Sequence, residues 1–333
     1  MGNKYRHLSL AEREEISCGI VGGKSFRALA KQLGRNVSTI SREVTERNPN
    51  KFFYRAVNAQ KVYDRKNEIR SKLRPKKLDQ YPPLKKYVFK KLRKRWSPEQ
   101  IAKTLKTEYP NDETMQVSSE TILYLLPKGS LRKELLSYLR QKRAYRRGRR
   151  KKTQENRGKI PEMISIEERP KEVEDRIIPG HWEGDLIIGK RQQSAIGTLV
   201  ERTTRFTIIV PLVARDAVSV RRALAREAKQ LPKQVRRTLT YDQGSEMTEH
   251  RLFAKDTKMK VYFCNPGSPW ERGANENTNG LIRDFFPKGT DFNQVTSREI
   301  KRVQKLLNER PRKILNWKTP GQAFNNILLG VAL

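Results

Sequence analysis

The chain has 333 residues, with 72 Lys and Arg against 36 Asp and Glu, so its formal net charge is +36. This length allows two or three domains with at least one substantial core, and the charge favours a polyanionic partner such as nucleic acid, although ribosomal and membrane-surface proteins share it. No apolar run is long enough to cross a bilayer, no apolar segment follows the basic N-terminus as in a secretory signal, and two Cys cannot form a disulfide framework or a Cys-x-x-Cys zinc site. We therefore expect a protein of a reducing compartment, without a membrane partner, whose metal ligands are oxygens.

The positive charge is concentrated in the first part of the chain. Residues 1–150 contain 38 Lys and Arg against 14 Asp and Glu, a net charge of +24, and residues 151–333 carry the remaining +12. A polyanion would therefore meet mainly the N-terminal part.

Residues 1–50 have the pattern of a helix-turn-helix domain. The run Ser9-Leu10-Ala11-Glu12 is a capping box, which predicts a helix to about Val21. Ser25 caps a second helix with apolar residues at i, i+3, i+4 and i+7, Gly34 ends it, and Ser38 starts a third helix. Two short helices joined through a glycine turn are typical of DNA-reading modules, although a plain helical hairpin has the same pattern. The residues expected to face base edges are Thr39, Ser41 and Arg42.

A similar pattern recurs in residues 96–130, after a basic helical connector over residues 51–95. The run Ser97-Pro98-Glu99-Gln100 combines an N-cap, a proline at the first helical position and a capping glutamine. Another capped helix is expected to start in the segment Val117-Ser118-Ser119-Glu120-Thr121-Ile122-Leu123-Tyr124-Leu125-Leu126 and to end at Pro127. This predicts a second helix-turn-helix, and a small helical packing domain is nearly as plausible. Residues 131–176 then form a linker that is first basic, with the run 140–152, and later acidic.

The pattern changes to strands near residue 177. Strands are expected over residues 177–189, 196–201, 205–212, 238–242 and 260–264, with helices at 217–230 and 273–286, and a helical tail follows. Three antiparallel strands followed by alternating helices and strands predict an α/β domain of ribonuclease-H-like order over residues 177–333. The chain is thus expected to be multidomain, with an all-α helix-turn-helix region before an α/β core.

That order gives three acids defined places: Asp185 on the first strand, Asp242 at the end of the fourth, and Glu276 on the helix beside them. Three carboxylates on separate segments could hold two Mg²⁺ ions, and acidic metal ligands in a strongly basic protein indicate phosphodiester chemistry on nucleic acid. Glu183 points to the same side of its strand as Asp185 and could assist or replace it. Glu246 is expected to lie on the surface, solvated or paired.

A specific resemblance supports this interpretation. The strongest signature is the run Arg272-Gly273-x-x-Glu276-Asn277-x-Asn279-Gly280-Leu281-Ile282-Arg283, followed by Pro287-Lys288. It resembles the signature of insertion-sequence transposases of the IS-thirty family, which carry a DDE triad of acids. The segments Trp182-Glu183-x-Asp185 and Asp242-x-Gly244 and the N-terminal helix-turn-helix fit the same family, so the resemblance spans essentially the whole chain. Gln243 and Asp284 depart from the family pattern without removing an expected metal ligand.

The resemblance implies a retroviral-integrase-type catalytic core that uses Mg²⁺ or Mn²⁺. Asp185 would bridge two ions, and Asp242 and Glu276 would each complete one. Arg283, two turns after Glu276, would contact DNA phosphate, and Arg272, one turn before it, shares that helix face.

The implied function is that of a DNA transposase. It would bind the terminal inverted repeats of a mobile element, free a 3′ end and transfer that strand to double-stranded target DNA. It would act as at least a homodimer, in the cytoplasm and associated with a prokaryotic nucleoid. Two alternatives remain open: an inert DNA-binding repressor of the same ancestry, and a ribonuclease-H-fold nuclease without joining activity.

Overall fold

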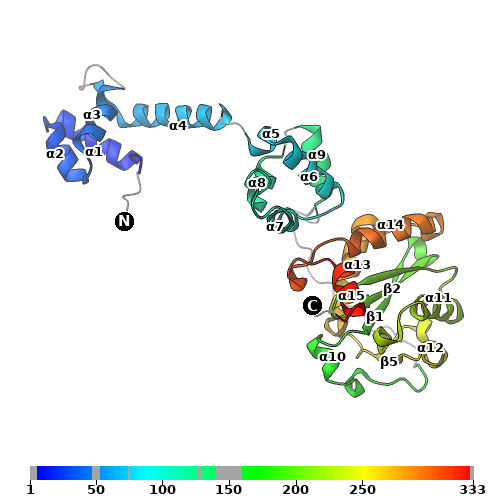
Figure 1. Ribbon diagram of the computed structural model, residues 1–333. Helices are drawn as coiled ribbons and strands as arrows, with labels where there is room; N and C mark the ends of the chain where they lie inside the picture. Colours follow the sequence, from blue (N-terminus) through cyan, green and yellow to red (C-terminus); the bar gives the residue numbers. More distant parts are fainter. Residues whose placement is uncertain (1–5, 47–52, 74–75, 127–128, 140–159, 331–333) are drawn as a thin grey trace. The chain divides into compact units, whose positions relative to one another are not determined.

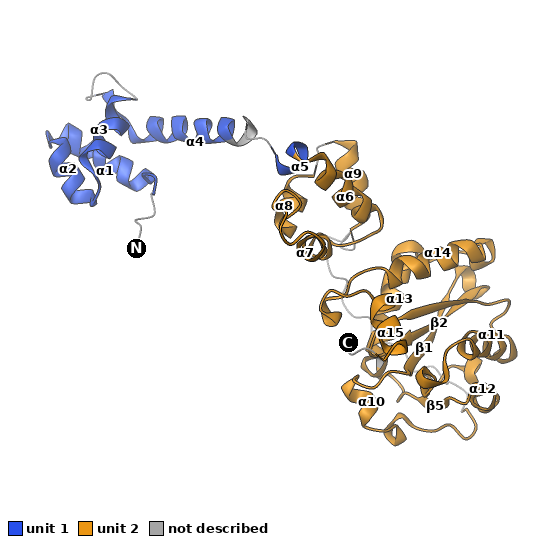
Figure 2. Cartoon of the chain, viewed as in Figure 1, with its two compact units in different colours: residues 1–80 blue, residues 81–333 orange. Residues whose placement is uncertain are grey.

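The computed structural model describes residues 6–46, 53–73, 76–126, 129–139 and 160–330. The chain forms two compact units, residues 1–80 and residues 81–333 (Figure 2). Within the described ranges, no helix has the length and apolar character needed to cross a membrane. The basic run 140–152 lies outside the described residues.

The described residues of the first unit form helices joined by loops, without a strand. Its helices are α1 (Leu10–Val21), α2 (Phe26–Leu33), α3 (Val37–Thr45), α4 (Ala56–Leu73) and α5 (Lys77–Gln80). The capping box of Ser9 and Glu12 is confirmed, and Gly34 ends α2 in the left-handed conformation that favours glycine. The third helix differs from the prediction at its start, because the Asn36 side chain, not Ser38, is the N-cap and accepts a hydrogen bond from the backbone N–H of Ser38.

A buried ion pair fixes α3 against α1. The Arg13 guanidinium donates to Glu43 at 2.8 Å, and the two side chains are 2% and 9% exposed. Around this pair, Ile16, Leu29 and Ile40 are fully buried. The orientation of α3 thus depends on both charge pairing and apolar packing.

The second unit begins with the helices α6 (Pro82–Arg93), α7 (Pro98–Glu108), α8 (Ser119–Tyr124) and α9 (Ser130–Ser137). The capping box of Ser97 and Gln100 is present, with Pro98 at the first helical position. α6 packs against both α7 and α9. The helical region around the predicted second helix-turn-helix therefore includes residues before 96 and after 130.

The rest of the second unit, residues 160–330, is built on a mixed sheet. Its strands are β1 (His181–Ile188), β2 (Ala195–Glu201), β3 (Thr207–Pro211), β4 (Thr238–Tyr241) and β5 (Lys260–Phe263), in the order β3-β2-β1-β4-β5. β1, β2 and β3 are antiparallel neighbours, whereas β4 and β5 run parallel to β1. This confirms the ribonuclease-H-like order predicted from the sequence.

Helices cover both faces of this sheet (Figure 1). The helices of this region are α10 (Glu172–Asp175), α11 (Ala217–Lys229), α12 (His250–Thr257), α13 (Gly273–Phe285), α14 (Ser297–Asn308) and α15 (Pro320–Leu328). The 3₁₀ turns among them are η2 (Ile166–Glu168), η3 (Lys190–Gln192), η4 (Lys233–Val235), η5 (Ser245–Met247), η6 (Pro269–Arg272), η7 (Phe292–Gln294) and η8 (Lys313–Leu315). Trp182 of β1 joins the core with α11 and α12, and Ile187 joins the core with α13 and α14. Residues of β1 therefore alternate between the two layers.

Both edges of the sheet are covered. On β3, the Asn308 side chain of α14 accepts from the backbone N–H of Thr207 and donates to its carbonyl, at 2.9 and 2.8 Å. On β5, Phe263 donates its backbone N–H to Ile164 at 2.9 Å, and Ile160 is buried in the core. The described end of the predicted linker is thus part of the α/β domain, and both edges are protected from pairing with other strands.

Candidate active site

The sheet brings Asp185 and Asp242 together. β1 and β4 are parallel neighbours, with Glu183 beside Thr240. Continuing this register by two residues puts Asp185 beside Asp242, the first residue after β4. Two acids that lie far apart in the sequence therefore meet because the fourth strand pairs directly with the first.

Arg272, the last residue of η6, links the two carboxylates. Its guanidinium lies 3.4 Å from Asp185 Oδ1 and 3.2 Å from Asp242 Oδ2, and it donates to the Gly184 carbonyl at 2.8 Å. Burial works to lower the pKa of Arg272, but the nearby charges of Asp185 and Asp242 outweigh burial and raise it above its ordinary value. The residue is only 8% exposed. Its two Nη atoms are turned to protein oxygens, whereas its buried Nε has no hydrogen-bond partner among the described residues. The DNA-phosphate contact that the sequence predicts for Arg272 stays a prediction.

Asp185 is held by two further groups. Its Oδ1 accepts from the backbone N–H of Leu186 at 2.9 Å, and its Oδ2 accepts from the Asn279 amide at 2.8 Å. Burial raises the pKa of the Asp185 carboxyl, Arg272 opposes that rise, and the charge of Asp242 adds to it. A carboxylate in this environment is stabilised by any additional cation.

Asp242 offers a free oxygen atom. Its Oδ1 is buried and has no hydrogen-bond partner among the described residues, whereas Oδ2 is bound by Arg272. A buried carboxylate oxygen without a partner is costly unless a cation or a donor binds it. The carboxylate oxygens of Asp185 and Asp242 are therefore suitable ligands for a hard divalent metal ion, which prefers oxygen.

Glu276 is placed on the same side of the sheet, but it does not complete the cluster. It lies in the first turn of α13 and is exposed, and α13 packs on β1 and β2. Within the described ranges, no group of three His, Cys, Asp or Glu side chains is close enough to hold a metal ion. The structure thus joins two of the three predicted acids and leaves the third outside the cluster, on a helix that packs on β1.

Two asparagines of the signature fix the position of α13. The hydroxyl of Thr198, on β2, lies 3.1 Å from the amide oxygen of Asn275 and 3.2 Å from that of Asn279. Because these asparagines are four residues apart, they lie on one helix face, and Glu276 next to Asn275 projects elsewhere. The sequence did not predict a role for either: Asn279 belongs to the quoted signature, whereas Asn275 falls at one of its unspecified positions.

Glu183 does not compete with Asp185. It is fully buried, pairs with Arg202 at 3.0 Å, and accepts from the backbone N–H of Asn275 at 2.8 Å. Burial lowers the pKa of Arg202 to about 10, although the charge of Glu183 opposes this. Glu183 therefore anchors the start of α13 to β1.

Glu246 differs from the expected surface position. It is half-buried, and burial raises the pKa of its carboxyl, with the charges of Asp242 and Asp185 adding to the rise. A Cβ at Gly244 would lie 2.4 Å from both of its carboxylate oxygens, so the glycine makes room for this side chain. The feature of the sequence that could have indicated this position is Gly244, two residues before Glu246.

The remaining predicted DNA contacts lie in different settings. Arg283, on α13, is half-buried and donates to the Ile188 carbonyl at 2.6 Å. On α3, Arg42 is exposed, whereas Thr39 and Ser41 are half-buried. Gln243 is one of the two residues that depart from the family pattern. Its side-chain amide donates to the Cys264 carbonyl at 3.1 Å and connects the loop after β4 to the end of β5.

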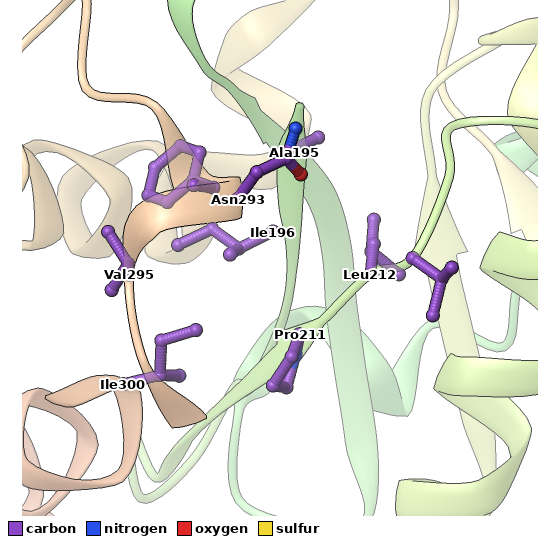
Figure 3. Close-up of a pocket in the computed structure, with 9 residues that line it drawn as sticks. Ala195, Ile196, Pro211, Leu212, Asn293, Val295 and Ile300 are labelled. Carbon is purple, nitrogen blue, oxygen red and sulfur yellow. The ribbon is translucent and has the colours of Figure 1, made fainter. Parts of the chain in front are cut away.

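A separate cavity of about 270 Å³ lies beside β2 and β3 (Figure 3). Most of the residues that line it have apolar side chains, among them Ile196, Pro211 and Ile300. None of the predicted site residues lines it, so it is not part of the carboxylate site.

Comparison with known proteins agrees with this architecture. A family model described as "Integrase core domain" matches residues 176–269, and one described as "Helix-turn-helix domain" matches residues 4–47. The chain is 45% identical to "Transposase InsI for insertion sequence element IS30A" of Escherichia coli (strain K12), over 98% of this chain and 85% of that protein. It is 42% identical to "Transposase for insertion sequence element IS1086" of Cupriavidus metallidurans, over 98% and 96% of the two chains, and 36% identical to "Transposase for insertion sequence element IS4351" of Bacteroides fragilis, over 97% of each. Because these matches span nearly the whole chain and include both domains, the chain belongs to the IS30 family of insertion-sequence transposases and is an enzyme of DNA transposition.

Proposed function

We propose that this transposase binds the terminal inverted repeats of its element through its N-terminal helices and cuts and joins DNA at Asp185, Asp242 and Glu276. The observation that carries the proposal is the pair of adjacent aspartates, one with a buried carboxylate oxygen that lacks a partner. Their position at the junction of β1 and β4 is consistent with the integrase-core family.

Integrase-core transposases generally use divalent metal ions, and we propose Mg²⁺ or Mn²⁺ for this chain. Asp185 and Asp242 would hold the ion or ions, and Glu276 would complete the set. Ions bound there would activate the attacking oxygen and stabilise the charge on the leaving oxygen. We propose that the exposed Glu276 side chain turns towards the aspartates by a change of side-chain rotamer when the ions bind.

The proposed reaction has two balanced steps. In cleavage, water attacks phosphorus and the bond to the 3′ oxygen breaks, which leaves a 3′-hydroxyl and a 5′-phosphate. In joining, that 3′-hydroxyl attacks a phosphodiester of the target, so one P–O bond forms and another breaks. The two ends must be held together for this exchange, and we therefore propose that the active form is at least a dimer.

DNA reading is assigned to α3. Its exposed side includes Arg42, and the buried pair of Arg13 and Glu43 fixes the helix against α1. We propose that Thr39, Ser41 and Arg42 face base edges, while the many surface Lys and Arg neutralise phosphates without reading sequence. We also propose that Arg283 contacts phosphate when DNA is bound.

The test is an assay with DNA carrying the ends of the element, in Mg²⁺, with mapping of cut and joined strands. We expect both products from the wild-type protein, and end binding without either product from Asp242→Asn and Glu276→Gln. Cutting without joining would favour a nuclease, and end binding without cutting by the wild type would favour a repressor. Normal strand transfer by either variant would overturn the site assignment.

A further inference from the structure

Arg272 binds the oxygens that a metal ion would need. Asp185 Oδ1 meets the Leu186 N–H and Arg272, and Asp185 Oδ2 accepts from Asn279. Asp242 Oδ2 meets Arg272, and Asp242 Oδ1 is the buried oxygen without a partner. An ion can therefore reach Asp242 through its free oxygen, but binding both aspartates places it next to the guanidinium.

The guanidinium is well suited to hold the two carboxylates together. It is 8% exposed, and the Gly184 carbonyl on β1 fixes it by a third contact. Its single positive charge offsets part of the repulsion between two carboxylates in a poorly solvated position. A divalent ion at the same oxygens would offset more of that repulsion, and it would repel the guanidinium.

We propose that Arg272 and the divalent ion compete for Asp185 and Asp242, and that the ion must displace the guanidinium from at least one aspartate before it binds both. This inference rests on the proposed metal site. Arg272 then offsets the negative charge of the two carboxylates until the ion enters. Displacement also turns its donors away from protein oxygens, which would make them available to a DNA phosphate.

Two other possible roles of Arg272 predict different effects of its loss on stability and on metal affinity. If Arg272 only anchors α13 to β1 through the Gly184 carbonyl, its loss lowers stability without changing metal affinity. If it organises the aspartates so that they can bind metal, its loss weakens metal binding. Competition alone predicts tighter binding, because removing the guanidinium removes both a rival cation and the charge that repels the ion.

The experiment is a calorimetric titration of the full-length protein with Mn²⁺, without DNA. We expect Arg272→Gln to bind Mn²⁺ about tenfold more tightly than wild type or better, given the strength of charge repulsion at such distances. The matched control is Arg283→Gln, which removes one positive charge from the same segment at a residue whose guanidinium donates to backbone carbonyls. It should bind Mn²⁺ like the wild type.

The outcomes separate this inference from the proposed function. Unchanged or weaker binding by Arg272→Gln would overturn the competition. If that variant does not fold, Arg272→Lys takes its place: it cannot reproduce the planar two-carboxylate contact, so it should also bind Mn²⁺ more tightly, by a smaller factor, and unchanged affinity would overturn the idea. If Asp242→Asn binds Mn²⁺ as well as the wild type does, the metal site itself is wrong, whatever Arg272 does.

Discussion

The buried pair of Glu183 and Arg202 provides a sharp test of which acids are structural. Glu183→Gln keeps the size of the side chain and an oxygen that can accept from the Asn275 N–H, but it removes the negative charge. Arg202 would then be left in a position where burial already lowers its pKa to about 10 with Glu183 beside it. The two side chains are 0% and 5% exposed and 3.0 Å apart, so solvent cannot replace the lost charge.

The expected loss of stability follows from this burial. Removing one partner of a buried ion pair costs about 3–5 kcal/mol, because the remaining charge is uncompensated. We expect a loss within that range, because the single side-chain oxygen of glutamine can accept from Arg202 or from the Asn275 N–H but not from both. Urea unfolding followed by circular dichroism measures this loss, with wild type and Asp242→Asn in parallel.

Metal binding by the same variant completes the test. At a temperature where Glu183→Gln is folded, it should still bind Mn²⁺, because Glu183 is occupied by Arg202 and the Asn275 N–H. Wild-type stability combined with loss of Mn²⁺ binding would refute the structural assignment and make Glu183 a ligand in place of Asp185.

Three further predictions follow from single residues. Burial lowers the pKa of His181 to about 4, with nearby Arg237 adding to the effect. Because this folded-state pKa lies below the unfolded one, the free energy of unfolding decreases as pH falls from about 6.5 towards 4, by roughly 2 kcal/mol at pH 5. Urea unfolding at pH 7 and pH 5 should therefore show a smaller loss of stability for His181→Gln than for the wild type. Gly184→Ala puts a Cβ 2.6 Å from the buried Tyr241 ring and should destabilise the protein by about 1–3 kcal/mol in the same assay; an unaffected variant would contradict this packing. Arg42→Ala should weaken binding to element ends by about 1–3 kcal/mol in a DNA titration, and equal binding of wild type and variant would remove Arg42 from the reading surface.

The parts of the fold that sequence predicts well are those set by local chemistry. The capping boxes at Ser9 and Ser97 specify helix starts because the cap and its partner are three residues apart. The position of Asp242 beside Asp185 also follows from the sequence, because the order of the elements determines which strands pair. Only the third N-cap was misplaced, by two residues, since Asn36 and Ser38 are equally able to cap a helix.

The partners of the charged side chains could not be predicted in the same way. Arg272 pairs with Asp185, 87 positions before it, and Glu183 accepts from the backbone of Asn275, 92 positions after it. Neither helical nor strand periodicity indicates such partners. Glu246 was expected at the surface because it follows a strand end in a polar stretch, but the fold of the loop at Gly244 brings it back towards Asp242. Such contacts depend on how α13 and η5 pack on the sheet, which is a property of the whole domain.

The residues on one face of β1 lie in different environments along the strand, and this difference defines the site. Three alternate residues face α13: Glu183 is buried against Arg202, Asp185 reaches Arg272 and Asn279, and Ile187 joins the apolar core with Leu281. A fully paired acid and an apolar contact thus lie on either side of Asp185 and hold α13 in place. Asp185 is the position between them where the carboxylate is still partly exposed, so the proposed metal ion and DNA would meet it without disturbing the two anchors.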